Sequence, residues 1–316
     1  MNGVWLEDGI VSLRDDLPFP IAGEREAIIR VLSAGICTTD HGLIDGMFPY
    51  VGVIGHEFVG VVDKGPESVS GRRVVGEIVS ACRRCVACHK GRTSHCPERT
   101  VLGITNRNGV FAEYTALPVE NLYVVPESVS TEFATFIEPL AAAMQIIEQV
   151  HITSSDSVLV VGSGKLAQLV VRTLLLTGCV LSCVGRSKRT LALCPKEVEM
   201  YRVDQLQDTQ FDVVVECTGN AEGFKIARQA VRPAGTLVLK STYPGELEID
   251  CTSLVVDEVT IVGSRCGPFS AAIRLLESGY VDLTALIDGT FPLNLAIEAL
   301  SQSRRPGTLK ILLDMS

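Results

Sequence analysis

Basic residues are scarce relative to acidic residues in this sequence. The 316 residues include 28 lysines and arginines against 37 aspartates and glutamates, which gives a formal net charge of −9. Binding along a nucleic-acid backbone needs a basic face, so the composition argues against nucleic acid as a partner. One small anionic cofactor in a local basic pocket is compatible with this balance.

The sequence also lacks long apolar runs, internal repeats and low-complexity tracts. The nearest approach to a membrane span, residues 169–184, is interrupted by Arg172. The start of the chain has neither a basic nor an apolar leader segment, so we expect a cytoplasmic protein whose eleven cysteines are reduced thiols or metal ligands. Hydrophobic residues make up 47% of the chain, which allows a large core, and the length suggests about two domains.

Two short segments contain side chains that could bind one metal ion. Cys37 offers a thiolate, His56 an imidazole and Glu57 a carboxylate. Zinc accepts such mixed ligands, and a catalytic zinc keeps one position open for water or substrate. Asp40 could orient the imidazole of His56, and the hydroxyl of Thr39 could exchange a proton with an alcohol at the metal.

A further carboxylate, Glu138, lies in an apolar setting where an unpaired charge would be costly. A metal ion would offset that cost. The surrounding residues 130–150 predict a helix, and we expect Pro139 to break or kink it just after Glu138. Such a break is a place from which a ligand could project.

Four cysteines lie close together in the chain: Cys82, Cys85, Cys88 and Cys96. Their spacing predicts a closed tetrahedral zinc site. A redox Cys-x-x-Cys pair is one alternative, but four thiols fit a metal better; a nucleic-acid-binding zinc ribbon is another, and the acidic balance opposes it. His89 and His95 are expected to be solvated. The other cysteines lack ligand spacing and are expected to be buried: Cys179, Cys183, Cys194, Cys217, Cys251 and Cys266.

A glycine-rich turn stands between a predicted buried strand, residues 157–161, and a helix predicted from Gln168 to Thr177. This Gly-x-Gly-x-x-Ala pattern is typical of a dinucleotide-binding turn, whose glycines let the backbone approach a pyrophosphate at the helix N-terminus. An ordinary strand-to-helix turn is the alternative. The candidate cofactor contacts here are Gly162, Gly164, Lys165, Leu166 and Ala167.

The next predicted strand, residues 180–184, ends in a basic turn. Proteins that bind NAD usually place an acidic residue there for the ribose hydroxyl, whereas this chain has Gly185, Arg186 and Ser187. A basic cluster can accept the 2′-phosphate of NADP. We therefore predict NADP rather than NAD, with a solvated basic turn as the alternative.

The segments around Cys37 and His56 resemble those of the zinc-dependent medium-chain alcohol dehydrogenases. The Glu138-Pro139 pair resembles the branch that contains the sorbitol, threonine and glucose dehydrogenases, and the likeness covers nearly the whole chain. It implies one catalytic zinc held by Cys37, His56 and Glu138, with Glu57 nearby or exchanging with water. It also implies a structural zinc in the four-cysteine cluster.

The chain departs from this family at Gly42, where a histidine often ends the proton relay. His41 is one residue early, so the resemblance does not extend to the relay beyond Thr39, which is expected to be the first proton carrier. The family's chain path implies that Lys310 could approach Asp40, although a solvated lysine is the favoured alternative. The side chains expected to line the substrate pocket, unless they only pack, are Met47, Phe48 and Tyr50.

The resemblance implies an α/β fold with a Rossmann doubly wound parallel sheet and a β-rich GroES-like catalytic barrel. We expect a catalytic domain with its zinc lobe over residues 1–139, a Rossmann domain over 140–267, and a return to the catalytic domain over 268–316. The implied enzyme transfers a hydride between an alcohol, polyol or sugar and NAD(P), as a homodimer or homotetramer.

Two alternatives to this function remain open from the sequence. One is a non-catalytic nucleotide- and zinc-binding protein that retains the fold, since a fold does not determine a function. The other is a zinc-independent NADPH reductase, which would have little use for Cys37, His56 and Glu138 together.

Overall fold

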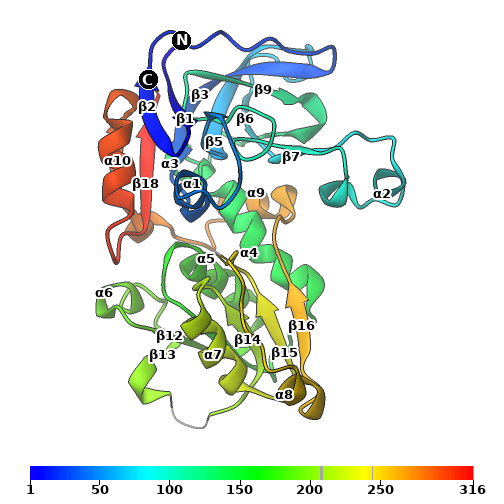
Figure 1. The fold of residues 1–316 in the computed structure, drawn as a ribbon, viewed down its shortest axis with the longest axis vertical. Coiled ribbons are helices and arrows are strands. Elements are labelled where there is room, and N and C mark those ends of the chain that lie inside the picture. Colours follow the sequence, from blue (N-terminus) through cyan, green and yellow to red (C-terminus); the bar gives the residue numbers. More distant parts are fainter. Residues whose placement is uncertain (207–208, 244, 316) are drawn as a thin grey trace. The chain divides into compact units, whose positions relative to one another are not determined.

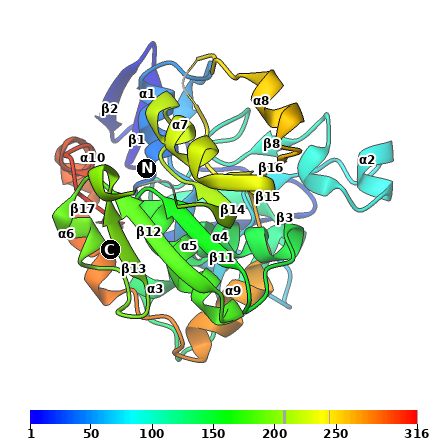
Figure 2. The same ribbon diagram turned by 90° about the horizontal axis from the view of Figure 1, so that it is seen from below.

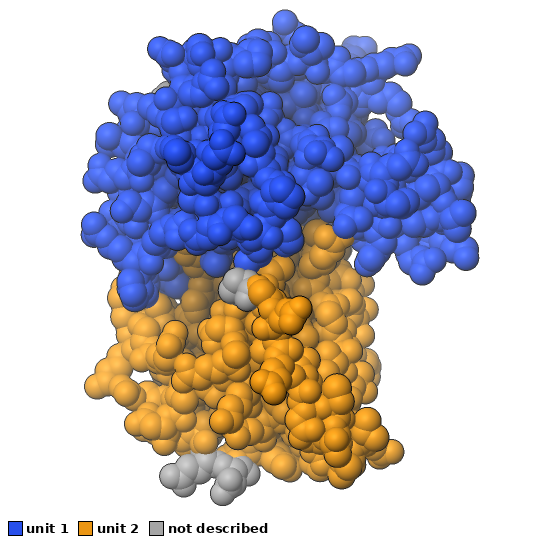
Figure 3. All heavy atoms as spheres, viewed as in Figure 1, with its two compact units in different colours: residues 1–138, 269–283, 287–316 blue, residues 139–268, 284–286 orange. Residues whose placement is uncertain are grey.

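The computed structural model describes residues 1–206, 209–243 and 245–315. They form two compact units, coloured separately in Figure 3. The first unit comprises residues 1–138, 269–283 and 287–316, and the second comprises residues 139–268 and 284–286. The chain passes from the first unit to the second between residues 138 and 139 and returns between residues 268 and 269. The predicted domain organisation stays a prediction.

The first unit is built mainly from short strands (Figure 1). Its larger sheet has the order β10-β6-β5-β3-β18-β17, with β9 also paired to β3. The β3–β18 pairing joins residues near opposite ends of the chain, because Leu312 lies opposite Gly35. The strands of this sheet are β3 Glu26–Gly35, β5 Glu57–Lys64, β6 Arg73–Gly76, β9 Tyr114–Pro118, β10 Leu122–Val124, β17 Ile287–Pro292 and β18 Lys310–Asp314.

Smaller elements complete the first unit. A three-stranded sheet contains β1 Gly3–Glu7, β2 Ile10–Arg14 and β4 Gly52–Val53. A two-stranded ribbon contains β7 Val79–Ser80 and β8 Thr100–Val101. The helices are α1 Thr38–Ile44, α2 Val86–His89, α3 Thr131–Ala134, α9 Phe269–Glu277 and α10 Ala296–Ser303, and the 3₁₀ turns are η1 Thr93–His95, η2 Val119–Asn121 and η6 Leu293–Leu295.

The second unit contains a six-stranded sheet with the order β13-β12-β11-β14-β15-β16 (Figure 2). All of its pairings are parallel. This order reverses between β11 and β14, which is typical of a dinucleotide-binding doubly wound sheet. The strands are β11 Ser157–Val161, β12 Val180–Gly185, β13 Glu199–Arg202, β14 Phe211–Glu216, β15 Val231–Leu239 and β16 Thr260–Gly263.

Helices connect these parallel strands. Leu159, Val161 and Val214 of the sheet share a core with residues of the helix α7, Ala221–Ala230. Near-continuous apolar strands of this kind are typical of a parallel sheet that is buried on both faces. The connecting elements are α5 Lys165–Leu174, α6 Lys188–Leu191, α7 Ala221–Ala230, α8 Cys251–Val256, η3 Leu175–Thr177 and η4 Val203–Gln205. The 3₁₀ turn η5 Thr284–Leu286 also belongs to this unit. Among the described residues, no helix combines the length and apolar character needed to cross a membrane.

The predicted helix over residues 130–150 is two helices, and the break lies before Glu138 rather than after it. α3 ends at Ala134, and α4 runs from Ile137 to Gln149. The prediction of a break at Pro139 was therefore wrong. A proline in the first turn of a helix costs no hydrogen bond, because the N–H that it lacks would have had no partner inside the helix. Pro139 thus lies at the start of α4, and Glu138 lies in its first turn.

Candidate active site

The first candidate site lies where β3 passes into α1 beside the start of β5. The register of these two strands places Gly35 opposite Glu57. A Cβ atom on Gly35 would lie 2.4 Å from the Glu57 carboxylate, so only glycine fits this approach. Cys37, the residue before α1, is thereby brought next to His56 and Glu57.

Cys37, His56 and Glu57 together form a group of metal-binding side chains. One ligand atom from each lies within 4.8 Å of the others. His56 and Glu57 are buried, whereas Cys37 is half-buried. A soft thiolate, an imidazole and a carboxylate in this arrangement suit zinc. The donor set therefore fits a metal ion.

The carboxylate of Asp40 contacts the backbone of Cys37 and the ring of His56. Its Oδ2 accepts a hydrogen bond from the backbone N–H of Cys37 at 2.8 Å, and its Oδ1 lies 3.2 Å from Nδ1 of His56. Among the described residues, neither of the latter two atoms has a partner with regular hydrogen-bond geometry. Burial lowers the pKa of His56, but the charges of Asp40 and Cys37 outweigh it and hold that pKa well above its usual range. A metal ion bound to Nε2 of His56 would take the place of a proton on that nitrogen, while Nδ1 stayed turned toward Asp40.

Thr39 and Glu138 occupy different positions relative to this group. Thr39 Oγ1 lies 3.7 Å from Cys37 Sγ, which places the hydroxyl at the edge of the group. Glu138 is half-buried in the first turn of α4. Its carboxylate is not among the ligand atoms that lie within 4.8 Å of one another in the described part of the chain. Its role as a zinc ligand stays a prediction.

Lys310 contacts the group from β18. Its ammonium is buried, forms an ion pair with the Glu57 carboxylate, and lies 5.6 Å from the centre of the Phe136 ring. The favoured expectation of a solvated lysine was therefore wrong, and the ion-pair partner is Glu57 rather than Asp40. Burial lowers the pKa of Lys310, but Glu57 first, and then Cys37 and Asp40, raise it above its ordinary value. The pairing depends on strand register across the whole chain, which the local sequence does not reveal.

Replacing Lys310 with methionine should destabilise the metal-free protein by about 3–5 kcal/mol, because it leaves the buried Glu57 carboxylate without its cation. Urea unfolding of metal-free samples measures this change. Lys64→Met, which removes an exposed lysine of the same unit, is the matched control. Equal stability of the Lys310→Met protein and the control would show that the ion pair contributes nothing.

His41 and Gly42, the positions where a proton relay beyond Thr39 would continue, are both engaged in packing contacts. The ring Nε2 of His41 lies 2.7 Å from Ser303 Oγ, and the imidazole is buried. At Gly42, a Cβ atom would lie 3.2 Å from the end of the Met47 side chain. His41 therefore links α1 to α10, and Met47 occupies the space beside Gly42.

Phe48 and Tyr50, the other two residues expected to line the substrate pocket, differ in exposure and in their contacts. Phe48 is exposed, whereas the hydroxyl of Tyr50 donates to the carbonyl oxygens of Val53, at 2.6 Å, and Arg107, at 3.0 Å. Burial raises the pKa of Tyr50 above its usual range, and the charge of Asp40 adds to this effect. The hydroxyl of Tyr50 therefore holds two backbone segments together.

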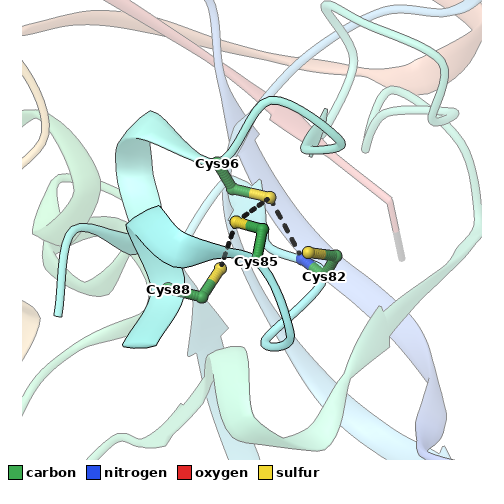
Figure 4. A group of neighbouring side chains, drawn as sticks. All are labelled: Cys82, Cys85, Cys88 and Cys96. Carbon is green, nitrogen blue, oxygen red and sulfur yellow. Dashed lines mark hydrogen bonds between the residues drawn. The ribbon is translucent and has the colours of Figure 1, made fainter. Parts of the chain in front are cut away.

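The four-cysteine cluster forms a second candidate metal site (Figure 4). Its four sulfur atoms all lie within 4.8 Å of one another. Cys85 Sγ lies 3.5 Å from Cys88 Sγ and 3.8 Å from Cys96 Sγ. Sulfurs at the corners of a tetrahedron with zinc–sulfur bonds of about 2.3 Å are separated by about 3.8 Å. The donor set and its spacing therefore fit a closed zinc site.

The cluster lies in a loop-rich segment that includes α2 and η1 and is flanked by β7 and β8. Desolvation, followed by the neighbouring Cys85 thiol, raises the pKa of Cys88 to about 12. A divalent ion would reverse this effect, because thiolates are its ligands. His89 and His95 are exposed, as predicted.

The remaining cysteines are not uniformly buried, which corrects the sequence-based expectation. Cys179, Cys183 and Cys194 are buried, Cys217 and Cys266 are half-buried, and Cys251 is exposed. Cys251 begins α8, whose residues from Cys251 to Val256 have no fully buried member. The expectation that all six are buried was therefore wrong, because sequence spacing does not predict exposure.

The glycine-rich turn of the second unit has the expected position between β11 and α5. Gly162 has a φ of +110°, which favours glycine, and Gly164 is the residue that caps α5. Gly164 is exposed, and a Cβ atom there would meet nothing within 4 Å. Lys165 and Leu166 are half-buried and Ala167 is buried against the sheet. The turn is therefore open on the side where a pyrophosphate could approach the helix N-terminus.

The basic turn after β12 is shaped by Ser163. A Cβ atom on Gly185 would lie 2.4 Å from Ser163 Oγ, and this hydroxyl lies 2.7 Å from Thr190 Oγ1. An acidic side chain at position 185 is therefore excluded by packing. Arg186 is exposed, with its guanidinium 3.9 Å from Glu222, and Ser187 caps α6.

Family models match both units of the chain. Residues 23–127 match the alcohol dehydrogenase GroES-like domain, and residues 193–278 match the zinc-binding dehydrogenase model. The L-threonine 3-dehydrogenase of Pyrococcus horikoshii is 30% identical over 302 residues, covering 86% of this chain and 85% of that protein. The L-galactonate-5-dehydrogenase of Escherichia coli K12 is 27% identical, covering 86% of each.

Solved structures of similar proteins share the fold. A zinc-binding dehydrogenase of Sinorhizobium meliloti 1021, bound to NADP, has a TM-score of 0.89 and 27% identity over 99% of this chain and 98% of that one. An alcohol dehydrogenase of Escherichia coli CFT073, complexed with NADH, has a TM-score of 0.91 and 25% identity over 100% of this chain and 99% of that one. These likenesses confirm the predicted fold class, with a Rossmann sheet and a GroES-like barrel. The chain belongs to the zinc-dependent medium-chain dehydrogenase/reductase family and is an oxidoreductase of the alcohol dehydrogenase type.

Proposed function

We propose that the protein transfers a hydride between a small alcohol, polyol or sugar and NADP, with zinc bound at Cys37 and His56. The observation that supports this most is the convergence of Cys37, His56 and Glu57 within 4.8 Å in the unit that matches the GroES-like domain. The dehydrogenases among its relatives favour catalysis over the non-catalytic alternative. A panel of polyols, sugars and simple alcohols, each assayed with NADP and NAD, tests the proposal.

The residues of the chain divide the chemistry among them. A bound zinc supplies a Lewis acid that polarises the oxygen of the alcohol or carbonyl. Asp40 holds His56 in orientation. Thr39 would relay the hydroxyl proton during oxidation, accepting it from the substrate while its own hydroxyl proton passes to solvent water, and would relay a proton in the opposite sense during reduction. A bound nicotinamide would accept or donate the hydride.

We propose Glu138 as the third zinc ligand, with Glu57 exchanging at the metal. The ion pair with Lys310 supports this division, because it already neutralises the Glu57 carboxylate. Glu138 comes from a different element, the first turn of α4, and the family resemblance implies a carboxylate ligand at this position.

NADP is the proposed cofactor, because the turn after β12 offers a cation and no acid. Packing of Ser163 against Gly185 excludes an aspartate that could accept hydrogen bonds from a ribose. Arg186 is exposed and Ser187 half-buried beside it, so both can reach a 2′-phosphate.

Replacing Arg186 with alanine should weaken NADP binding by about tenfold to a hundredfold, since a charge-assisted contact with the phosphate is lost. NAD binding should change little. Dissociation constants for both cofactors measure the effect, with Lys196→Ala as a control because Lys196 is exposed before the amino end of β13. A native enzyme with a clear preference for NAD would contradict the assignment.

The four-cysteine cluster is proposed to bind a structural zinc that contributes stability and subunit contact, not chemistry. Its closed set of four thiols supports this, because a catalytic zinc needs an open position. Reduced thiols in this cluster also favour a cytoplasmic location.

We propose a homodimer or homotetramer. In the described sheet, β16 is an edge strand that pairs only with β15. Ile261 on this strand is 38% exposed, and Val255 and Val256 on the preceding helix are 77% and 74% exposed. An apolar, unpaired edge is a surface that a second copy of the chain can cover.

The double variant Val255→Asp/Val256→Asp should therefore be monomeric at concentrations where the native protein is oligomeric. Light scattering coupled to size-exclusion chromatography measures the mass. Val180→Asp, at an exposed valine on β12, is the control and should keep the native mass. A native protein that elutes as a monomer would rule out the proposed assembly.

A further inference from the structure

A pair of buried hydroxyl groups joins two turns that are separate in the chain. Ser163 lies in the glycine-rich turn after β11, and Thr190 lies in α6, which follows the basic turn after β12. Ser163 Oγ lies 2.7 Å from Thr190 Oγ1, and the two residues are 6% and 3% exposed. Because β11 and β12 are neighbours in the sheet, the two turns emerge side by side (Figure 2). The hydroxyl pair therefore links turns that meet only in the folded chain.

Thr190 also fixes the backbone of the basic turn. Its hydroxyl donates to the carbonyl oxygen of Ser187 at 3.3 Å, and its backbone N–H donates to Ser187 Oγ at 3.3 Å. Because the hydroxyl hydrogen of Thr190 is directed to that carbonyl, Thr190 Oγ1 is the acceptor for the hydroxyl of Ser163. A chain of hydrogen bonds therefore runs from Ser163 through Thr190 to Ser187.

The side-chain amide of Gln168 holds the same two residues together. Gln168 is fully buried in α5, and its Nε2 donates to the carbonyl oxygens of Thr190, at 2.7 Å, and Ser163, at 3.3 Å. Its Oε1 accepts a hydrogen bond from Arg172 at 2.7 Å, which orients the amide. Breaking a buried network of this kind is costly, because a group that loses its partner there does not regain water. The network therefore holds the two turns at a fixed separation.

The glycines of the two turns leave the space between them to Ser163. A Cβ atom on Gly164 would meet nothing within 4 Å, so position 164 adds no contact between the turns. A Cβ atom on Gly185 would lie 2.4 Å from Ser163 Oγ. The hydroxyl of Ser163 thus fills the place beside Gly185, and its bond to Thr190 keeps it there.

A dinucleotide with a 2′-phosphate would have to reach both turns at once. In the proposed binding mode the pyrophosphate lies at the turn after β11, and the 2′-phosphate lies at Arg186 and Ser187. The adenosine between these two groups fixes their separation covalently. The second contact then adds to the first only if the protein presents its two turns at a matching separation.

We propose that Thr190 is a positioning residue for cofactor selectivity. Its hydroxyl holds the two turns at the separation at which one ligand places its pyrophosphate on the first turn and its 2′-phosphate on the second. Thr190 is buried, so it acts through Ser163 and Ser187. The preference for a 2′-phosphorylated cofactor therefore depends on a side chain beneath the basic turn. The inference rests on the proposed use of NADP.

Thr190→Val, which replaces the hydroxyl with a methyl group of similar size, tests the proposal. Titration calorimetry on the purified protein measures the dissociation constants of NADP, NAD, ADP and adenosine 2′-phosphate. NADP binding should weaken by about tenfold, which is the effect of losing one buried hydrogen bond between the turns. The other three ligands engage only one of the two turns with a phosphate group, so their constants should stay within about twofold of the native values.

Three further variants serve as controls. Thr190→Ser keeps the hydroxyl and should bind NADP as the native protein does. Ser163→Ala should reproduce the effect of Thr190→Val, and the double variant should weaken NADP binding no further, because both changes remove the same hydrogen bond. Thr173→Val removes a different buried hydroxyl, one that donates to a carbonyl within α5, and should leave all four constants unchanged.

Native binding of NADP by Thr190→Val overturns the inference. So does a Thr190→Val protein in which NADP, NAD and ADP weaken equally, since that result assigns the hydroxyl a purely structural role. If the native protein does not prefer NADP to NAD, the proposed cofactor fails first. If the native protein prefers NADP and both Thr190→Val and Ser163→Ala keep that preference, the inference alone fails.

Discussion

Replacing Cys37 with serine is expected to remove one of two zinc ions per chain and to lower kcat/KM by at least about a thousandfold. The expected loss follows because Lewis-acid stabilisation is worth several kcal/mol, and each 1.36 kcal/mol changes a rate about tenfold. Cys251→Ser, which changes an exposed thiol on α8, is the matched control and should keep both zinc and turnover. Metal analysis and steady-state kinetics on the same samples measure both effects.

Two further variants separate the carboxylates at this site. Glu138→Gln should weaken zinc binding more than Glu57→Gln, because the Glu57 carboxylate is already paired with Lys310. If Cys37→Ser retained native turnover in a sample whose metal content had been verified, the assignment of Cys37 as a catalytic zinc ligand would be wrong.

Replacing Cys96 with serine is expected to have a large effect of a different kind. Cys96 is fully buried, and its sulfur lies 3.8 Å from Cys85 Sγ. Losing one of four thiolates should release the zinc of this cluster and unfold the loop-rich segment around it, at a cost of several kcal/mol, since metal binding there is coupled to folding. Thermal unfolding and limited proteolysis across residues 82–96 measure the loss.

Turnover separates this variant from Cys37→Ser. Below its unfolding temperature, the Cys96→Ser protein should keep one zinc and substantial activity, because the Cys37 group uses none of these four thiols. Native zinc content and native resistance to protease in the Cys96→Ser protein would contradict a structural zinc in the cluster.

Local patterns in the sequence predicted what local chemistry determines. The apolar strand and glycine-rich turn at residues 157–167 predicted β11 and a helix after the turn, since both follow from neighbouring residues. The predicted start at Gln168 was three residues late, because α5 begins at Lys165 within the turn motif. The spacing of Cys82, Cys85 and Cys88 predicted a tight thiol cluster for the same reason. The family resemblance supplied the fold class.

Interactions between distant parts of the chain could not be predicted in the same way. The ion pair of Lys310 with Glu57 depends on β18 lying beside β3, which in turn pairs with β5. The contact of Ser163 with Gly185 depends on the parallel pairing of β11 with β12. The helix break before Glu138 was misplaced because a proline can start a helix as well as end one.

Counting zinc per chain in carefully purified native protein tests the central claim most directly. Two tightly held ions are expected, of which the Cys37→Ser protein should lose one together with its activity. A native protein that turns over an alcohol with a single zinc, still present in Cys37→Ser but lost in Cys96→Ser, would contradict the account.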